Sequence, residues 1–276
     1  MADARPIGVF DSGVGGLTVL GALRRRLPTE RLLYVADLAH FPYGPRYQEE
    51  VRGFALRIVE HLVDADVKLV VIACNTATAA ALNACRERFD VPVVGVISPG
   101  AQAAVDATRN GRVAVISTEG TRASQQYLHA MWEVNPGVGI LPLAAPDLVD
   151  IVEDGDADTP RAEAALRPLV DEVLAWGADT LVLGCTHYPL LRPALQRVAG
   201  DRLQVVDSAE TTADRVERIL AVNRLAAGPE AAPTPVVEVT AHPERLRAVA
   251  ARFLGEDVPD PRTVALWPSR PTAVAS

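Results

Sequence analysis

The chain has 276 residues, 49% of them hydrophobic and 22% charged, which suffices for one large hydrophobic core or two smaller ones. Its formal net charge of -8 disfavours nucleic acid as a partner, because that binding depends on clustered lysines and arginines. The first apolar run, Ile7–Phe10, ends at Asp11 and is too short for a secretory signal, and the longest uncharged run, 69–85, falls short of a membrane-spanning helix. We therefore expect a soluble, cytoplasmic protein of two domains that binds neither nucleic acid nor a membrane.

Short runs rich in Val, Ile and Leu recur along the chain, and stretches of helical period follow most of them. The predicted strands are Ile7–Phe10, Leu32–Ala36, Leu69–Ala73, Val93–Ile97, Val113–Ile116, Ile140–Leu143, Leu181–Leu183 and Leu203–Val206. Strands that alternate with helices are typical of βα units, so we expect an α/β fold with mainly parallel sheets.

The last part of the chain continues this pattern less regularly. Gly228–Pro235 is predicted to be a loop, Val236–Ala241 a strand and Pro243–Leu254 a helix. The proline-rich end from Val258 to Ser276 is expected to be an irregular tail.

Two pairs of segments resemble each other. KLVVIACNTA (68–77) and DTLVLGCTHY (179–188) both contain a strand that ends in a small residue, a cysteine and a polar pair. VFDSGVGG (9–16) and VISTEGTR (115–122) are both a strand followed by hydroxyl and glycine residues. These matches have two interpretations, chance similarity among βα units or an internal duplication. Two similar halves that face each other would bring both cysteines to one cleft.

Cys74 and Cys185 each lie where a predicted parallel strand gives way to a helix, the edge of a sheet at which α/β proteins bind ligands. A helix N-terminus offers free N–H groups and a positive dipole end, so we expect a lowered thiol pKa at both cysteines. Either cysteine alone could be a small buried apolar residue. The matched positions favour a functional pair, whereas Cys85, inside a helical stretch, is predicted to be structural.

Hydrogen-bonding residues accompany both cysteines. Asn75–Thr76 and Thr186–His187 follow them directly and suit either helix capping or the binding of a polar ligand. Asp11–Ser12 follows the first strand, so that its carboxylate is expected to project into the same cleft or to form a plain turn.

The glycines at 13, 15 and 16 raise the alternative of a dinucleotide-binding site, with Asp37 as the acid that would bind a ribose. The spacing fails, because GxGxxG counted from Gly13 requires glycine at a position occupied by Thr18. No phosphate-loop motif or metal-ligand spacing is present in the sequence either.

The chain contains a single lysine, Lys68. Pyridoxal phosphate needs a lysine for its Schiff base. Lys68 flanks a predicted strand and is interpreted as a solvated charge, so we expect no such cofactor.

Five motifs together resemble those of the glutamate racemases, in the aspartate/glutamate racemase superfamily. They are FDSGVGGLTV (10–19), FPYG (41–44), ACNTAT (73–78), VISPG (96–100) and GCTHYPLL (184–191). Agreement with that family runs in order from about residue 6 to residue 220. Leu38 replaces a commonly found Thr, and the C-terminal tail does not align. Related aspartate racemases generally carry Glu at the position of His187, and hydantoin racemases also differ there, so the resemblance favours glutamate.

The resemblance implies two similar doubly wound α/β domains, related by a pseudo-twofold axis, with the active site in the cleft between them. The first would comprise residues 1–98 and 208–276 and the second residues 99–207. It also implies a homodimer that binds D- and L-glutamate, uses no cofactor or metal, and supplies D-glutamate for peptidoglycan synthesis.

Carried over by position, Cys74 and Cys185 would be the catalytic acid and base, with Asp11 and His187 as their respective helpers. Glu153 is a further candidate for an assisting role, although from the sequence it could equally be a solvated helix residue. The implied substrate contacts are Asp11, Ser12, Tyr43, Gly44, Asn75, Thr76, Thr118, Thr121, Thr186 and His187.

Racemisation removes the α-proton on one face of the carbon and returns a proton on the other, so two groups must flank that carbon. A single base would tend to restore the original configuration. Thiols titrate close enough to physiological pH to serve in both roles. The alternatives are a racemase acting on aspartate or hydantoins, a dinucleotide-binding oxidoreductase and a non-catalytic binding protein.

Overall fold

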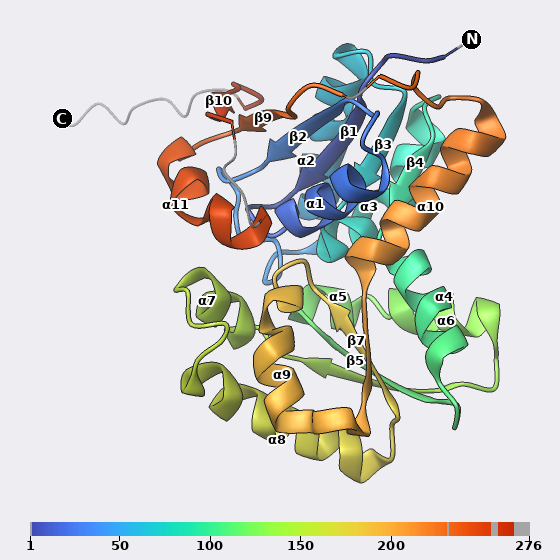
Figure 1. Cartoon of the computed structure of the whole chain (residues 1–276), viewed down its shortest axis with the longest axis vertical. Coiled ribbons are helices and arrows are strands. Elements are labelled where there is room, and N and C mark those ends of the chain that lie inside the picture. Colours follow the sequence, from blue (N-terminus) through green and yellow to red (C-terminus); the bar gives the residue numbers. More distant parts are fainter. Residues whose placement is uncertain (1, 231, 255–258, 268–276) are drawn as a thin grey trace.

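The computed structural model describes residues 2–230, 232–254 and 259–267. Two parallel β-sheets form its framework (Figure 1). The larger sheet has the strand order β10-β9-β2-β1-β3-β4 and the smaller sheet β6-β5-β7-β8. The larger sheet comprises β1 (Ile7–Asp11), β2 (Leu32–Ala36), β3 (Leu69–Ile72), β4 (Val93–Gly95), β9 (Val236–Val239) and β10 (Arg262–Thr263). The smaller comprises β5 (Arg112–Ser117), β6 (Gly139–Ala144), β7 (Thr180–Gly184) and β8 (Gln204–Asp207). Every strand pair is parallel, which confirms the predicted α/β class.

The strand order repeats between the two sheets. Strands β2-β1-β3-β4 of the larger sheet correspond in sequence order to β6-β5-β7-β8 of the smaller sheet. Each cysteine motif follows the third strand of its own set, since Cys74 comes after β3 and Cys185 after β7. Internal duplication predicts such a repeat, and the same strand order is also common among unrelated doubly wound sheets.

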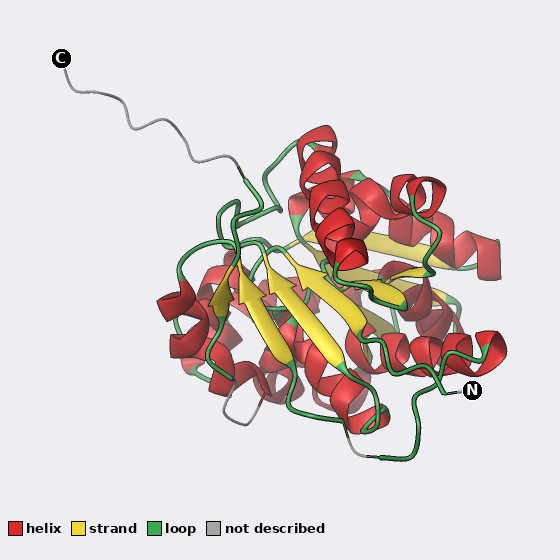
Figure 2. Ribbon diagram, turned by 90° about the horizontal axis from the view of Figure 1, so that it is seen from above, coloured by secondary structure: helices red, strands yellow, loops and turns green. Residues whose placement is uncertain are grey.

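Helices cover both faces of the larger sheet. One face packs against α1 and α10, with α11 beside them, and the other against α2 and α3 (Figures 1 and 2). Alternate residues of β2 divide between the two faces, because Tyr34 belongs to the first cluster and Val35 to the second. The helices are α1 (Leu17–Arg26), α2 (Gln48–Asp64), α3 (Asn75–Arg88), α4 (Ile97–Ala107), α5 (Glu119–Ala123), α6 (Gln126–Val134), α7 (Asp147–Glu153), α8 (Pro160–Trp176), α9 (Arg192–Ala199), α10 (Ser208–Asn223) and α11 (Pro243–Leu254).

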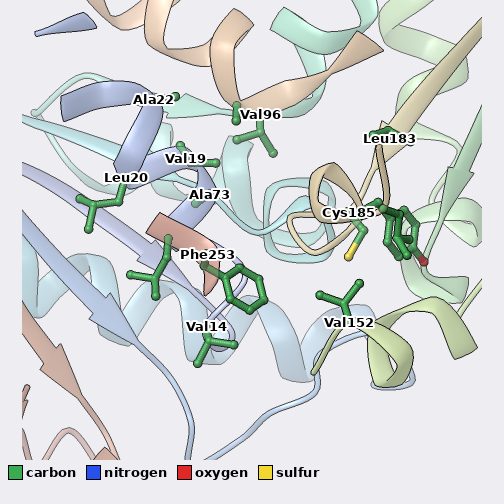
Figure 3. Packing of buried hydrophobic residues seen from close by; sticks show 14 of the residues in the cluster. Val14, Val19, Leu20, Ala22, Ala73, Val96, Val152, Leu183, Cys185 and Phe253 are labelled. Carbon is green, nitrogen blue, oxygen red and sulfur yellow. The ribbon is translucent and has the colours of Figure 1, made fainter. Parts of the chain in front are cut away.

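The largest hydrophobic cluster extends from the larger sheet to the smaller one. Figure 3 shows Cys185 near Val152 of α7, with the ring of Phe253 from α11 directed toward Val152. The cluster therefore joins elements from both sheets beside the second cysteine.

Two predictions about element limits are wrong. Ile97 begins α4 rather than ending a strand, because β4 stops at Gly95. The expected irregular tail includes β10, which pairs with β9, and Leu266 is only 7% exposed. The segment that contains β10 and Leu266 is ordered because it packs against the larger sheet. Its high proline content had favoured the prediction of an irregular structure. Val258 and residues 268–276 of the predicted tail lie outside the described residues.

The interpretation of Lys68 as a solvated charge is also wrong. Its side chain is fully buried, and its Nζ lies 2.5 Å from the carboxylate of Glu30 and donates a hydrogen bond to the backbone oxygen of Asp3 at 2.7 Å. An ammonium group can be buried when an opposite charge and a hydrogen-bond acceptor replace its water. The lysine is therefore part of the core.

No helix of the described residues is long and apolar enough to cross a membrane.

Candidate active site

Cys74 and Cys185 lie at the carboxyl ends of equivalent strands. Cys74 is the N-cap of α3, and its Sγ accepts a hydrogen bond from the backbone N–H of Ala77 at 3.4 Å. Cys185 follows β7 at the start of a tight turn that leads to the short 3-10 helix Tyr188–Leu191. Parallel strands of one sheet end at the same edge, and the two sheets direct these edges toward a common space.

That space is a cavity of about 450 Å³, within the range of small-molecule sites. Both cysteines line it, together with residues from the loops after the strands of both sheets. The lining is Ser12, Phe41, Pro42, Tyr43, Gly44, Pro45, Cys74, Asn75, Thr76, Thr118, Glu119, Pro146, Asp147, Val149, Asp150, Cys185, Thr186 and His187.

The sequence predicted a lowered pKa for the Cys74 thiol, and this is wrong. Burial raises the pKa of Cys74 to about 12, and the negative charge of Asp11 acts in the same direction. The hydrogen bonds that Cys74 makes with Ala77 and Ser12 oppose this shift but do not outweigh it. The helix N-terminus is present as predicted, but the loss of water around the thiol is the stronger effect.

Cys185 has a cationic neighbour. Nδ1 of His187 lies 3.9 Å from its Sγ, and Nε2 of His187 lies 3.0 Å from Oε1 of Glu153. Burial disfavours the imidazolium, but the interactions with Cys185 and Glu153 outweigh it and raise the pKa of His187 to about 10. At neutral pH a protonated, positively charged His187 therefore stands beside the Cys185 side chain.

Asp11 lies behind the cavity wall and is fully buried. One carboxylate oxygen accepts the backbone N–H of Gly13 at 3.0 Å, and the other accepts the hydroxyl of Thr186 at 3.4 Å. Burial raises the pKa of Asp11, although the charge of His187 opposes the shift. The carboxylate thus joins the first strand of the larger sheet to the turn that carries Cys185.

Hydroxyl groups from both sheets meet on another wall of the cavity. Oγ1 of Thr76 lies 3.0 Å from that of Thr118 and 3.2 Å from that of Thr121. Nearby, Asn75 accepts the phenol hydroxyl of Tyr127 through Oδ1, whereas its buried Nδ2 has no hydrogen-bond partner among the described residues. A buried donor without a partner is costly, so this amide is suited to a ligand with acceptor oxygens.

Two glycines allow the loops of the larger sheet and those of the smaller sheet to approach closely. A Cβ on Gly15 would come within 2.5 Å of Nδ1 of His187 and would also overlap Thr186. Thr18, the residue that breaks the dinucleotide motif, donates its hydroxyl to the backbone oxygen of Thr186 at 3.1 Å. A Cβ on Gly120 would meet the backbone oxygen of Gly44 at 2.7 Å. The first glycine loop is therefore shaped for contact with the second cysteine motif.

Asp37 anchors the loop that carries Tyr43 and Gly44. Its fully buried carboxylate accepts the hydroxyl of Tyr43 at 2.6 Å, the hydroxyl of Thr240 at 2.7 Å and the indole N–H of Trp267 at 3.2 Å. These donors occupy the oxygens that a ribose would need, so the alternative role of Asp37 in dinucleotide binding has no structural support.

We expect Asp37→Asn to lower the free energy of unfolding by about 2 kcal/mol, because an amide N–H₂ would face hydroxyl and indole donors. The Tyr43–Gly44 wall would loosen, and the KM for substrate would rise several-fold. Thermal denaturation and steady-state kinetics measure both effects, with Asp171→Asn on the exposed surface of α8 as the control. Unchanged stability and KM in Asp37→Asn would show that this carboxylate does not anchor the loop.

Most of the predicted site residues lie together. Asp11, Thr121 and Glu153 stand outside the lining and contact residues that form it. The sequence reasoning missed part of the lining, above all Pro146, Val149 and the acidic pair Asp147 and Asp150. These residues lie on α7 and just before it, where no motif marked them.

The matches to known proteins agree with this geometry. The family model described as Asp/Glu/Hydantoin racemase matches residues 17–216. The glutamate racemase of Corynebacterium diphtheriae is 46% identical, over 92% of this chain and 95% of its own length. The chain belongs to the glutamate racemases of this family.

Solved structures of glutamate racemases share the fold as well. The enzyme of Bacillus anthracis matches with a TM-score of 0.87 and 39% identity, over 94% of this chain and 97% of that one. The enzyme of Francisella tularensis, in complex with D-glutamate, matches with a TM-score of 0.86 and 30% identity, over 96% and 98% of the two chains. The two-sheet arrangement is thus that of the glutamate racemase family.

Proposed function

We propose that this chain interconverts L-glutamate and D-glutamate by a two-base mechanism in which Cys74 and Cys185 are the acid and base. The single observation that carries the proposal is that two cysteines at equivalent strand ends open into one cavity of about 450 Å³. The membership of the chain among the glutamate racemases, and the D-glutamate bound in the related structure, support glutamate over aspartate or hydantoins.

In each turnover the thiolate on one side takes the α-proton. The electron pair of the broken C–H bond passes to the α-carbon and its carboxylate. The thiol on the opposite side then gives its proton to the other face of the carbon and becomes a thiolate. Atoms and charge balance, and proton exchange with solvent resets the pair.

The two sides of the cavity differ in charge. On one side, protonated His187 places a positive charge beside Cys185. On the other side, the pKa of Cys74 near 12 keeps that thiol protonated in the free enzyme. A bound amino acid brings its α-ammonium into the cavity, and this positive charge offsets that of Asp11, so that Cys74 can also lose its proton.

The carboxylates of the substrate need hydrogen-bond donors. The unpaired Nδ2 of Asn75 and the hydroxyls of Thr76 and Thr118 are available on the walls, whereas the Thr186 hydroxyl donates to Asp11 and can accept from the substrate. Donors aimed at the α-carboxylate stabilise the negative charge that develops there when the α-proton leaves. Ser12, Tyr43, Gly44 and His187 complete the proposed substrate contacts, with Asp11 and Thr121 acting from behind the wall.

An isotope-exchange assay tests the function directly. The purified protein, incubated in deuterated water with either enantiomer of glutamate and no pyridoxal phosphate, should exchange the α-hydrogen and abolish the optical rotation. Proton NMR and polarimetry follow the two events. Turnover of aspartate but not glutamate would move the chain to a different substrate, and turnover of neither would refute the proposal. Detectable binding in an NAD(P) fluorescence titration would instead favour the oxidoreductase.

The proposal also covers the use of the product, the location of the protein and its oligomeric state. D-glutamate supplied to peptidoglycan synthesis, a cytoplasmic location and a homodimer are part of the same proposal, and sedimentation velocity tests the dimer. The two sheets also support a division into residues 1–98 with 208–276 and residues 99–207, which limited proteolysis would test.

A further inference from the structure

Glu153, the last residue of α7, stands between two basic side chains from distant parts of the chain. Oε1 faces Nε2 of His187 at 3.0 Å, and Oε2 is paired with Nη2 of Arg245 on α11. Arg252 lies farther along α11, and its Nη1 donates a hydrogen bond to the backbone oxygen of Glu153 at 3.1 Å. The Glu153 carboxylate is 13% exposed and His187 is 3% exposed, whereas the Arg245 side chain is 40% exposed, so solvent screens the pair with His187 less than the pair with Arg245.

The contact joins two parts of the molecule across the edge of the cavity. Helix α11 packs its buried side chains, Leu246 among them, into the cluster beside α1, whereas α7 packs against α8 next to the smaller sheet (Figure 1). The guanidinium carbon of Arg245 also lies 4.4 Å from the ring centroid of Phe41, a residue of the cavity wall. Arg245 therefore touches both the wall and the charged residues behind Cys185.

We propose that Arg245 is a positioning residue for the Cys185 half of the reaction. It holds the Glu153 carboxylate against Nε2 of His187, and the carboxylate in turn holds the imidazolium beside the Cys185 thiol. The inference rests on the proposed two-thiol mechanism. Its physical basis is a chain of alternating charges in which each carboxylate oxygen has one cationic partner.

The direction in which Arg245→Gln shifts the pKa of His187 depends on the groups that face this histidine. They are Cys185 after β7, Glu153 on α7 and Asp11 on β1. All three favour the imidazolium and hold the pKa of His187 near 10, whereas burial opposes it. The bonds from His187 and Arg245 also outweigh burial at Glu153 and lower the pKa of that carboxyl.

Loss of Arg245 removes a positive charge, which by itself raises the pKa of His187. It also frees the Glu153 carboxylate to rotate toward solvent, and on the proposed positioning role the loss of that contact outweighs the first effect and lowers the pKa of His187. Activity that depends on the His187 imidazolium is present below the pKa of His187 and is lost as the pH rises through that pKa. The basic limb of the kcat profile should therefore move to lower pH in Arg245→Gln.

The test measures kcat and KM against pH, in both directions, for the whole chain carrying Arg245→Gln or Arg245→Lys. We expect kcat of Arg245→Gln to fall about tenfold at neutral pH, with KM nearly unchanged, and Arg245→Lys to recover most of the loss. Arg247→Gln, which removes an exposed ion pair with Asp260 on the same helix, is the control and should behave as wild type. NMR of ¹³C-labelled histidine follows the pKa of His187 without reference to activity.

A merely structural role predicts different results. Arg252→Gln removes a contact to the backbone of Glu153 and leaves its carboxylate paired. If Arg245→Gln and Arg252→Gln lowered kcat equally, with the basic limb and the His187 titration unmoved, the positioning role would be refuted. Absence of racemase activity in the wild type would count against the proposed function instead, while the NMR titration would still decide whether Arg245 controls His187.

Discussion

Replacing Cys74 or Cys185 by Ala should reduce racemisation at least about 10³-fold in both directions, because each turnover needs one thiol on either face of the α-carbon. Each variant keeps the other thiol. That thiol can still remove the α-proton of the enantiomer it faces and return one from solvent on the same side. We therefore expect slow deuterium exchange without inversion, in one enantiomer of glutamate for Cys74→Ala and in the opposite enantiomer for Cys185→Ala.

The third cysteine provides the matched control for this experiment. Cys85 is fully buried in α3, and burial raises its pKa to about 11. Cys85→Ala should retain full activity and lose roughly 1 kcal/mol of stability through the smaller side chain. Circular dichroism verifies that all three variants fold, and polarimetry with NMR exchange measures their activity. Racemisation by either Cys74→Ala or Cys185→Ala near the wild-type rate would overturn the two-thiol mechanism.

Gly15→Ala should lower kcat/KM about 100-fold and the free energy of unfolding by about 1–3 kcal/mol. The added methyl group would overlap Thr186 and come within 2.5 Å of Nδ1 of His187. The His187 ring cannot move away without losing its place between Cys185 and Glu153. The substitution therefore pushes the turn that carries the second thiol away from the larger sheet.

Gly53→Ala is the control for this substitution. Gly53 lies on the exposed side of α2, and a Cβ there would meet no heavy atom within 4 Å. Alanine in an exposed helix interior should stabilise the protein by about 1 kcal/mol and leave kinetics unchanged. Chemical denaturation and steady-state kinetics compare the two variants. Wild-type kinetics in Gly15→Ala would show that the two halves tolerate a wider separation than their contact suggests.

Much of the fold and the proposed site was predictable from local patterns. Runs of Val, Ile and Leu must be buried on both faces of a parallel sheet, and this located the described strands of both sheets except β10. The position of Cys74 and Cys185 after equivalent strands followed from the same periodicity. Cys85 could be separated from them because it lies inside a helical stretch, and it is buried there.

Other features could not be predicted because they depend on residues far apart in sequence. Arg245 meets Glu153 from 92 positions away, and Thr240 and Trp267 meet Asp37 from more than 200 positions away. No local pattern encodes such pairs. The burial of Lys68 was missed for the same reason, since a lone lysine beside a strand reveals nothing of Glu30.

The sequence by itself determined the α/β class, the paired cysteine motifs and the resemblance that favours glutamate, because each depends on short-range order along the chain. The tertiary structure alone decided which charges surround each thiol. A helix N-terminus lowers the pKa of a thiol that lies within its first turn. At Cys74, however, burial and the nearby charge of Asp11 have the larger effect and raise the pKa. At Cys185 the decisive neighbour, His187, is local, whereas the residues that keep it protonated come from other elements. Electrostatic free energies depend on distance and solvent exposure in three dimensions, and neither can be read from residue order.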